Sequence, residues 1–265
     1  GKVNRQWVKY NGQKFYEMTN SISLGLLKLG VKKGDRIALI ATNCPEWNMI
    51  DFAIQQVGAI CIPIYPTISH ADYEYIFKHS EASVAFVINK HLYNKVSDII
   101  ASTPSIKDVY LIRASEDLKS LQELIELGNE NRDEAALEAR KAEVKNEDVA
   151  TIIYTSGTMG TPKGVMLTHR NILSVVEYLC PLYPIDETHD AISYLPLSHI
   201  YERTVQYCHI YLGCSTYYVD NLGAIIDTMA EIKPKHFSSV PRLIEKVYHT
   251  IVRKGHKLKG IKKTI

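Results

Sequence analysis

The feature that most constrains the fold is a regular alternation of short apolar runs with longer segments of helical period. Residues 36–41 form the apolar run RIALIA. From Asn43 onward, apolar residues recur at helical spacing as far as Val57, and Gly58 then precedes a second apolar run at 59–65. A strand, a helix and a strand joined by such short links form a βαβ unit, which implies parallel strands and a right-handed crossover.

The same alternation continues along the chain. Further strands are expected at 83–89, 108–112, 149–155, 165–168, 191–197, 215–219 and 236–240. Further helices are expected at 71–78, 93–101, 171–179 and 201–212, between 219 and 236, and from about 242. This order predicts an α/β fold of layered, doubly wound, mainly parallel sheets with flanking helices.

A charged, alanine-rich segment at 116–148 interrupts the alternation. Mixed charge of this kind is typical of a solvated surface, so we expect an exposed helix and a linker here rather than a partner-binding site. The segment would divide the chain into a first α/β part at 1–115 and a second at 149–265.

Composition and simple motifs argue against several classes of protein. A formal net charge of +2 gives no reason to expect nucleic acid or an anionic membrane as an obligatory partner. Five cysteines without a C-x-x-C pair favour a reduced, cytoplasmic setting over a disulfide framework. No apolar run reaches the roughly 18 residues of a membrane span. Neither a zinc-ligand spacing nor a G-x-S-x-G elbow occurs, so we expect no metal ligands and no serine hydrolase.

The segment with the clearest chemistry is the loop 154–164, YTSGTMGTPKG, between two strand-like runs. Its glycines allow close backbone approach, its backbone N–H groups and hydroxyls can donate, and Lys163 adds a positive charge, which together suit a polyphosphate. It is not a Walker loop, because Pro162 precedes the lysine and Gly164 follows it. The strand 165–168 follows at once, so a helix dipole does not hold the phosphate. At this point a hairpin without a ligand remains the alternative.

This loop resembles the phosphate-loop signature of the adenylate-forming superfamily, which comprises acyl-CoA synthetases, luciferases and peptide-synthetase adenylation domains. Met159 stands where threonine is typical and removes one hydroxyl. The segment 195–203, LPLSHIYER, resembles the downstream motif of the family at the acyl and adenylate pocket. Residues 30–67 resemble the N-terminal part of these enzymes, and residues 239–248 are similar to the long-chain fatty acyl-CoA synthetase branch in particular.

The resemblance implies a reaction in two steps. A carboxylate and Mg-ATP give an acyl-adenylate and pyrophosphate, and the CoA thiol then displaces AMP. It implies catalytic roles for Lys163 and for His199, which would line the acyl and adenylate pocket. Arg203 and Arg242 are equally compatible with a place in the pocket and on a helix surface. The implied nucleotide-binding residues are Thr155, Ser156, Gly157, Thr158, Met159, Gly160, Thr161 and Lys163.

Other motifs of the family do not occur in these 265 residues: the adenine-binding Y-G-x-T-E run, T-G-D, the D-R-x-K hinge and the late lysine. We therefore expect the N-terminal portion of a long-chain fatty acid–CoA ligase, an incomplete N-terminal domain with little activity alone. The parent would use ATP, Mg²⁺ and CoA with a fatty acid, without nucleic acid and with peripheral membrane contact as an open alternative. A ligase that hands its acyl group to a carrier protein, and a non-catalytic nucleotide- or acyl-binding module, also remain open. Acyl chain length and oligomeric state are not decided.

Overall fold

The larger of two main sheets has six strands in the order β6-β5-β3-β4-β7-β8. A computed structural model describes residues 1–3, 6–155 and 161–256 of the chain. Neighbouring strands are parallel apart from β7 and β8, which form an antiparallel hairpin. The strands are β3 (Arg36–Ile40), β4 (Ile60–Ile64), β5 (Val84–Val87), β6 (Asp108–Leu111), β7 (Val149–Thr155) and β8 (Lys163–Thr168).

The smaller sheet has three parallel strands in the order β10-β9-β11. A separate antiparallel pair, β1 with β2, lies at the N-terminus. These strands are β1 (Lys2–Val3), β2 (Gln6–Trp7), β9 (Asp190–Ser193), β10 (Ser215–Tyr218) and β11 (His236–Phe237).

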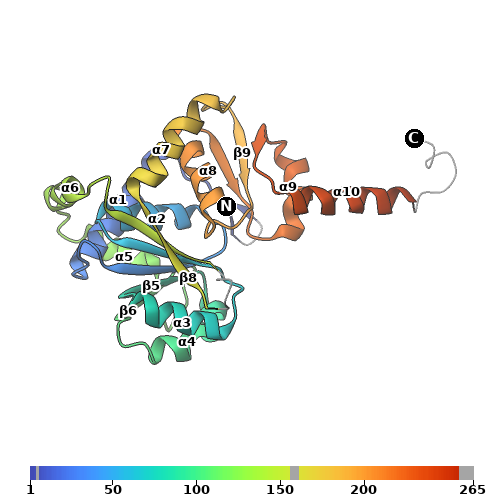
Figure 1. Cartoon of the computed structure of the whole chain (residues 1–265). Helices are drawn as coiled ribbons and strands as arrows, with labels where there is room; N and C mark the ends of the chain where they lie inside the picture. The colour runs from blue at the N-terminus through green and yellow to red at the C-terminus, as the bar shows by residue number, and fades with distance from the viewer. Residues whose placement is uncertain (4–5, 156–160, 257–265) are drawn as a thin grey trace.

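Helices cover both faces of the larger sheet. Helices α1, α2 and α5 lie on one face and α3 and α4 on the other, whereas α10 extends away from the rest of the molecule (Figure 1). The helices are α1 (Gly12–Lys28), α2 (Pro45–Gln56), α3 (His70–Ser80), α4 (Lys90–Ala101), α5 (Leu121–Asn129), α6 (Glu134–Glu143), α7 (His169–Leu179), α8 (Ile200–Tyr211), α9 (Ile225–Ile232) and α10 (Pro241–His256), with short 3₁₀ turns at η1 (Cys180–Leu182) and η2 (Leu222–Ala224).

Local sequence explains where many of these helices begin. An oxygen of a short polar side chain accepts a hydrogen bond from a backbone N–H of the first turn, which satisfies a donor that has no partner within the helix. In α2, Pro45 occupies the first turn, where its missing N–H costs nothing. The capping side chains are those of Asn11, Ser69, Asn89, Ser120, Asp133 and Thr168.

The fold class predicted from the alternation is confirmed: the sheets are dominated by parallel strands with helices on both faces. The central strands β3, β4 and β5 are buried on both faces, and this is why they read as continuous apolar runs. Several expected strands are shorter than predicted, among them β5, β9 and β11. Strand β9 ends at Ser193, because residues 194–199 turn away as a loop, and β11 has only two residues.

The charged segment at 116–148 contains two helices with different surroundings. Helix α6 is largely exposed, and Leu137 is its buried residue. Helix α5 instead packs on α1, with Leu124 fully buried. The approach is so close that a Cβ at Gly128 would lie 1.9 Å from the backbone oxygen of Ser21. The expected exposure is therefore wrong for α5, and the proposed division of the chain at this segment stays a prediction.

Candidate active site

The predicted phosphate loop lies at the tip of the β7–β8 hairpin. Thr155 is the last residue of β7, Lys163 is the first of β8, and the two are paired across the hairpin. Both side chains are exposed, as is that of Thr161. The five intervening positions that we predicted to bind nucleotide, Ser156, Gly157, Thr158, Met159 and Gly160, lie outside the described residues.

The larger sheet directs this hairpin toward its carboxyl edge. Strand β7 is parallel to β4, with Thr151 opposite Cys61, so the loop emerges at the edge where β3 and β4 also end. Ligands of open α/β sheets bind in the crevice outside the carboxyl ends of the strands. The position of the loop in the sheet therefore agrees with a binding role.

Tyr154, the first residue of the motif, anchors the hairpin to α3. Its hydroxyl lies 2.7 Å from Nδ1 of His79, and its ring meets that imidazole edge-on. Burial raises the pKa of Tyr154 to about 12, so the phenol stays protonated. This contact fixes the start of the loop, and Lys163 on the other strand of the hairpin is exposed.

His199 lies at the N-terminus of α8 and is exposed. Its Nδ1 accepts a hydrogen bond from the backbone N–H of Tyr201 at 3.1 Å. In the neutral imidazole the proton therefore sits on Nε2, which can donate to a ligand. The predicted site residue is thus accessible and held in one tautomer by the helix that it caps.

Arg203 occupies neither of the two positions expected for it. Its side chain is fully buried and forms an ion pair with Asp51 of α2, with Nε 2.9 Å from Oδ2. Its Nη1 also donates to Thr151 of β7 at 2.7 Å, and Nε lies 2.8 Å from the hydroxyl of Tyr207. Burial alone would lower the pKa of Arg203, but the carboxylate of Asp51 outweighs it and the pKa is raised. Arg203 therefore joins α8 to the larger sheet.

Arg242 is exposed at the start of α10. Its exposure is compatible with both alternatives that the sequence left open, so its role stays a prediction.

Glu202, next to this ion pair in the sequence, is a buried acid with no basic partner among the described residues. Its carboxylate accepts a hydrogen bond from Nε2 of Gln206 at 3.1 Å. Burial raises the pKa of Glu202 to about 7. Two turns further along α8, buried His209 lies 3.0 Å from His236 of β11, ring nitrogen to ring nitrogen. Helix α8 thus carries polar groups toward both sheets.

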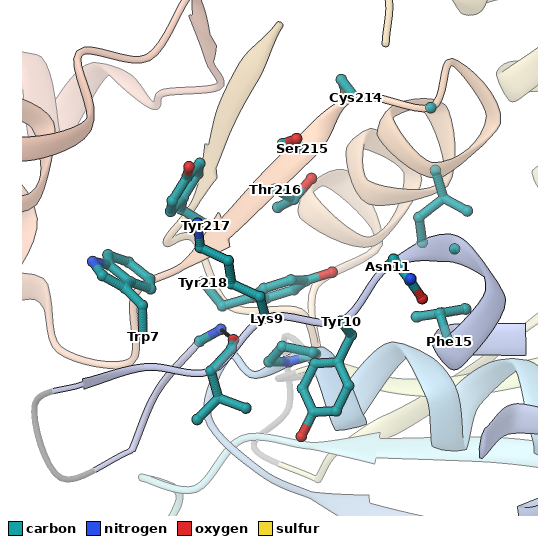
Figure 2. A pocket seen from close by; sticks show the side chains of 16 residues that line it. Trp7, Lys9, Tyr10, Asn11, Phe15, Cys214, Ser215, Thr216, Tyr217 and Tyr218 are labelled. Carbon is teal, nitrogen blue, oxygen red and sulfur yellow. Dashed lines mark hydrogen bonds between the residues drawn. The ribbon is translucent and has the colours of Figure 1, made fainter. Parts of the chain in front are cut away.

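A cavity of about 450 Å³ lies elsewhere, between the N-terminal segment and β10 (Figure 2). Trp7 and Tyr217 meet edge-on in its wall with 5.0 Å between ring centroids. Tyr10, Phe15 and Tyr218 add further aromatic surface. None of the residues that we predicted to bind substrate or nucleotide lines this cavity. No sequence motif indicated it, because its walls come from segments about 200 residues apart.

The described part of the loop suits phosphate better than a metal ion. It offers hydroxyl groups and an ammonium group but no carboxylate, the ligand that Mg²⁺ prefers in proteins. Across residues 1–3, 6–155 and 161–256, no group of three or more His, Cys, Asp and Glu side chains is placed to hold a metal ion. In the same ranges, no helix has the length and apolar character needed to cross a membrane.

Comparison with known proteins identifies the family. A family model described as AMP-binding enzyme matches residues 2–264. The chain belongs to the AMP-binding enzyme family. The resemblance inferred from the loop and from residues 195–203 is thereby confirmed.

Relatives in this family include fatty acid–CoA ligases. The chain is 32% identical to the long-chain-fatty-acid–CoA ligase FadD15 of Mycobacterium tuberculosis, over 94% of this chain and 41% of that protein. It is 30% identical to the human long-chain-fatty-acid–CoA ligase ACSBG2, over 99% of this chain and 41% of that protein. The chain thus spans about two fifths of the length of these relatives.

Solved structures of other proteins share the fold. A long-chain-fatty-acid–CoA ligase (FadD1) from Archaeoglobus fulgidus superposes with a TM-score of 0.80 at 24% identity, over 95% of this chain and 50% of that one. An inhibitor-bound N-terminal domain of FACL13 from Mycobacterium tuberculosis superposes with a TM-score of 0.74 at 22% identity, over 88% of this chain and 56% of that one.

Proposed function

We propose that the chain is the N-terminal portion of a long-chain fatty acid–CoA ligase. The whole protein would convert a fatty acid, ATP and CoA into acyl-CoA, AMP and pyrophosphate through an acyl-adenylate. The observation that carries this proposal is the β7–β8 hairpin, which presents the signature loop between Thr155 and Lys163 at the carboxyl edge of the larger sheet. The ligases among the relatives support the choice of substrate class.

The chemistry of the first step fits the groups at this edge. A carboxylate oxygen of the fatty acid attacks the α-phosphorus of ATP, the bond to the bridging oxygen of the β-phosphate breaks, and pyrophosphate leaves with the electron pair. Such a step needs positioning and charge neutralisation rather than a covalent enzyme intermediate. Lys163 would neutralise the β- and γ-phosphates as they become the leaving group. His199 would donate from Nε2 in the acyl and adenylate pocket.

The parent enzyme would also use Mg²⁺ and CoA, as its family implies. The described part of the loop offers no carboxylate to hold Mg²⁺. The second step would form the thioester bond between the acyl carbon and the CoA sulfur and release AMP. All five cysteines are buried free thiols, which supports a reduced, cytoplasmic setting. Contact with a membrane periphery stays a prediction.

The substitution Lys163→Ala tests the role of the loop. If Lys163 faces the outer phosphates, affinity for ATP should fall by about 1.5–3 kcal/mol, which is roughly 10- to 150-fold, while affinity for AMP changes little. Isothermal titration of the whole protein with each nucleotide measures both effects. Lys95→Ala is the matched control, because Lys95 is an exposed lysine on α4. An equal loss for ATP and AMP would show that the loop is wrongly assigned.

A further inference from the structure

One buried amide connects the larger sheet to the loop that carries His199. Asn43 follows β3 at the carboxyl edge of the sheet and precedes α2, and it is 7% exposed. Its side chain reaches across to the residues that follow β9, about 150 positions later in the chain. A buried amide that bonds so far along the chain fixes the relative position of the two segments.

The hydrogen bonds use both ends of the amide. Nδ2 of Asn43 donates to Oγ of Ser193 at 3.0 Å and to the carbonyl oxygen of Leu195 at 2.7 Å. Oδ1 accepts from the backbone N–H of Leu197 at 3.2 Å. Three bonds from one side chain therefore hold three alternate positions of the segment 193–197, where the chain leaves β9 and no longer pairs with the sheet.

The held segment leads directly into the turn of His199. The backbone N–H of His199 donates to the carbonyl oxygen of Pro196 at 2.9 Å, so the turn starts between two residues that Asn43 binds. His199 then begins α8 through the bond from its Nδ1 to Tyr201. A shift of residues 195–197 would therefore move the imidazole, because nothing but a tight turn separates them.

We propose that Asn43 is a positioning residue for His199. It fixes the loop 194–199 against the carboxyl edge of the larger sheet, and thereby sets where the imidazole lies relative to the phosphate loop on β7 and β8. The role in catalysis rests on the proposed ligase function, in which His199 contacts the substrate. The role of Asn43 in ordering the loop does not depend on that function, because it follows from the hydrogen bonds of Asn43 alone.

Two substitutions separate hydrogen bonding from packing. Asn43→Asp keeps the shape of the side chain but replaces the two donated bonds with a carboxylate oxygen facing the Leu195 carbonyl. Asn43→Ala removes every bond. Asn48→Ala is the matched control, because Asn48 is also a buried asparagine that reaches the second half of the chain, with its amide donating to Tyr218 of β10 at 2.6 Å. That bond does not touch the loop 194–199.

The first measurement is hydrogen exchange of the full 265-residue chain, followed by mass spectrometry of the peptide that spans 194–199. Both Asn43 variants should exchange at least tenfold faster in this peptide than the unsubstituted chain, while the Asn48 variant should not. Thermal unfolding of each variant checks that it is folded. Wild-type exchange in a folded Asn43→Asp variant would overturn the proposal.

The second measurement uses the whole ligase and fatty-acid-dependent exchange of pyrophosphate into ATP. Asn43→Asp should lower kcat about 10- to 100-fold, as expected when a site residue is misplaced by about 1 Å, with the KM for ATP nearly unchanged. An unchanged kcat, or an equal loss of kcat in Asn48→Ala, would contradict the catalytic part. If the unsubstituted protein shows no exchange of pyrophosphate, the proposed function fails, and the hydrogen-exchange result still decides whether Asn43 orders the loop.

Discussion

The buried carboxyl group of Glu202 leads to a sharp prediction about stability. Its side chain is 1% exposed, its hydrogen-bond partners are the neutral side chains of Ser193 and Gln206, and burial raises its pKa from 4.5 to about 7. A group whose folded pKa is raised in this way stabilises the fold at low pH and loses that contribution as it ionises. The contribution should therefore be complete below pH 4.5 and lost as the pH rises to about 7.

The substitution Glu202→Gln keeps the shape and an acceptor oxygen for Gln206 but cannot ionise. At 1.36 kcal/mol for each pH unit between the two pKa values, ionisation of the buried carboxyl costs about 3 kcal/mol. The variant should therefore match the unsubstituted chain near pH 4.5 and exceed its free energy of unfolding by about 3 kcal/mol at pH 8. Urea unfolding of both proteins across this pH range measures the difference.

The dependence on pH makes this prediction refutable. Glu177→Gln is the control for the substitution itself, because Glu177 is an exposed glutamate on α7. A constant difference for Glu202→Gln across the range, or a variant that is less stable at pH 8, would show that the carboxyl is not held in an unfavourable charged state.

Three further substitutions test other features of the fold by urea or thermal unfolding. Gly128→Ala should destabilise by about 1–3 kcal/mol, since its Cβ would lie 1.9 Å from the Ser21 oxygen, and a neutral effect would contradict that contact. Arg203→Met should cost about 3–5 kcal/mol by leaving Asp51 buried without its partner, and a gain in stability would refute this. Burial lowers the pKa of His209 to about 4, so His209→Gln should reduce the loss of stability between pH 6.5 and 4, whereas an unchanged slope would contradict it.

Sequence patterns predicted those helices and strands in which the spacing of apolar residues along the chain matches the side chains that are buried. Strands β3 to β5 are buried on both faces and, apart from Arg36, are apolar, so their positions along the chain could be recognised. Helix α1 was not predicted. The reason is visible in its packing: Thr19, Asn20, Ser21 and Ser23 are polar but buried, so the apolar period of a helix is broken.

Long-range contacts were the part that the sequence could not provide. The motif marked Lys163 and His199 as site residues, and the hairpin places Lys163 at the edge where a ligand would bind. Nothing in the local sequence linked Arg203 to Asp51, or Asn43 to Leu197, because each pair lies more than 150 residues apart. Contacts between such distant residues leave no repeating pattern in the local sequence, so they become visible only in the folded structure.

The most direct test of the proposed function is exchange of labelled pyrophosphate into ATP by the whole protein, measured with and without a long-chain fatty acid. We predict exchange that requires the fatty acid, because pyrophosphate can return to ATP only from an acyl-adenylate. A protein that binds ATP but shows no exchange with any long-chain fatty acid would contradict the assignment as a fatty acid–CoA ligase.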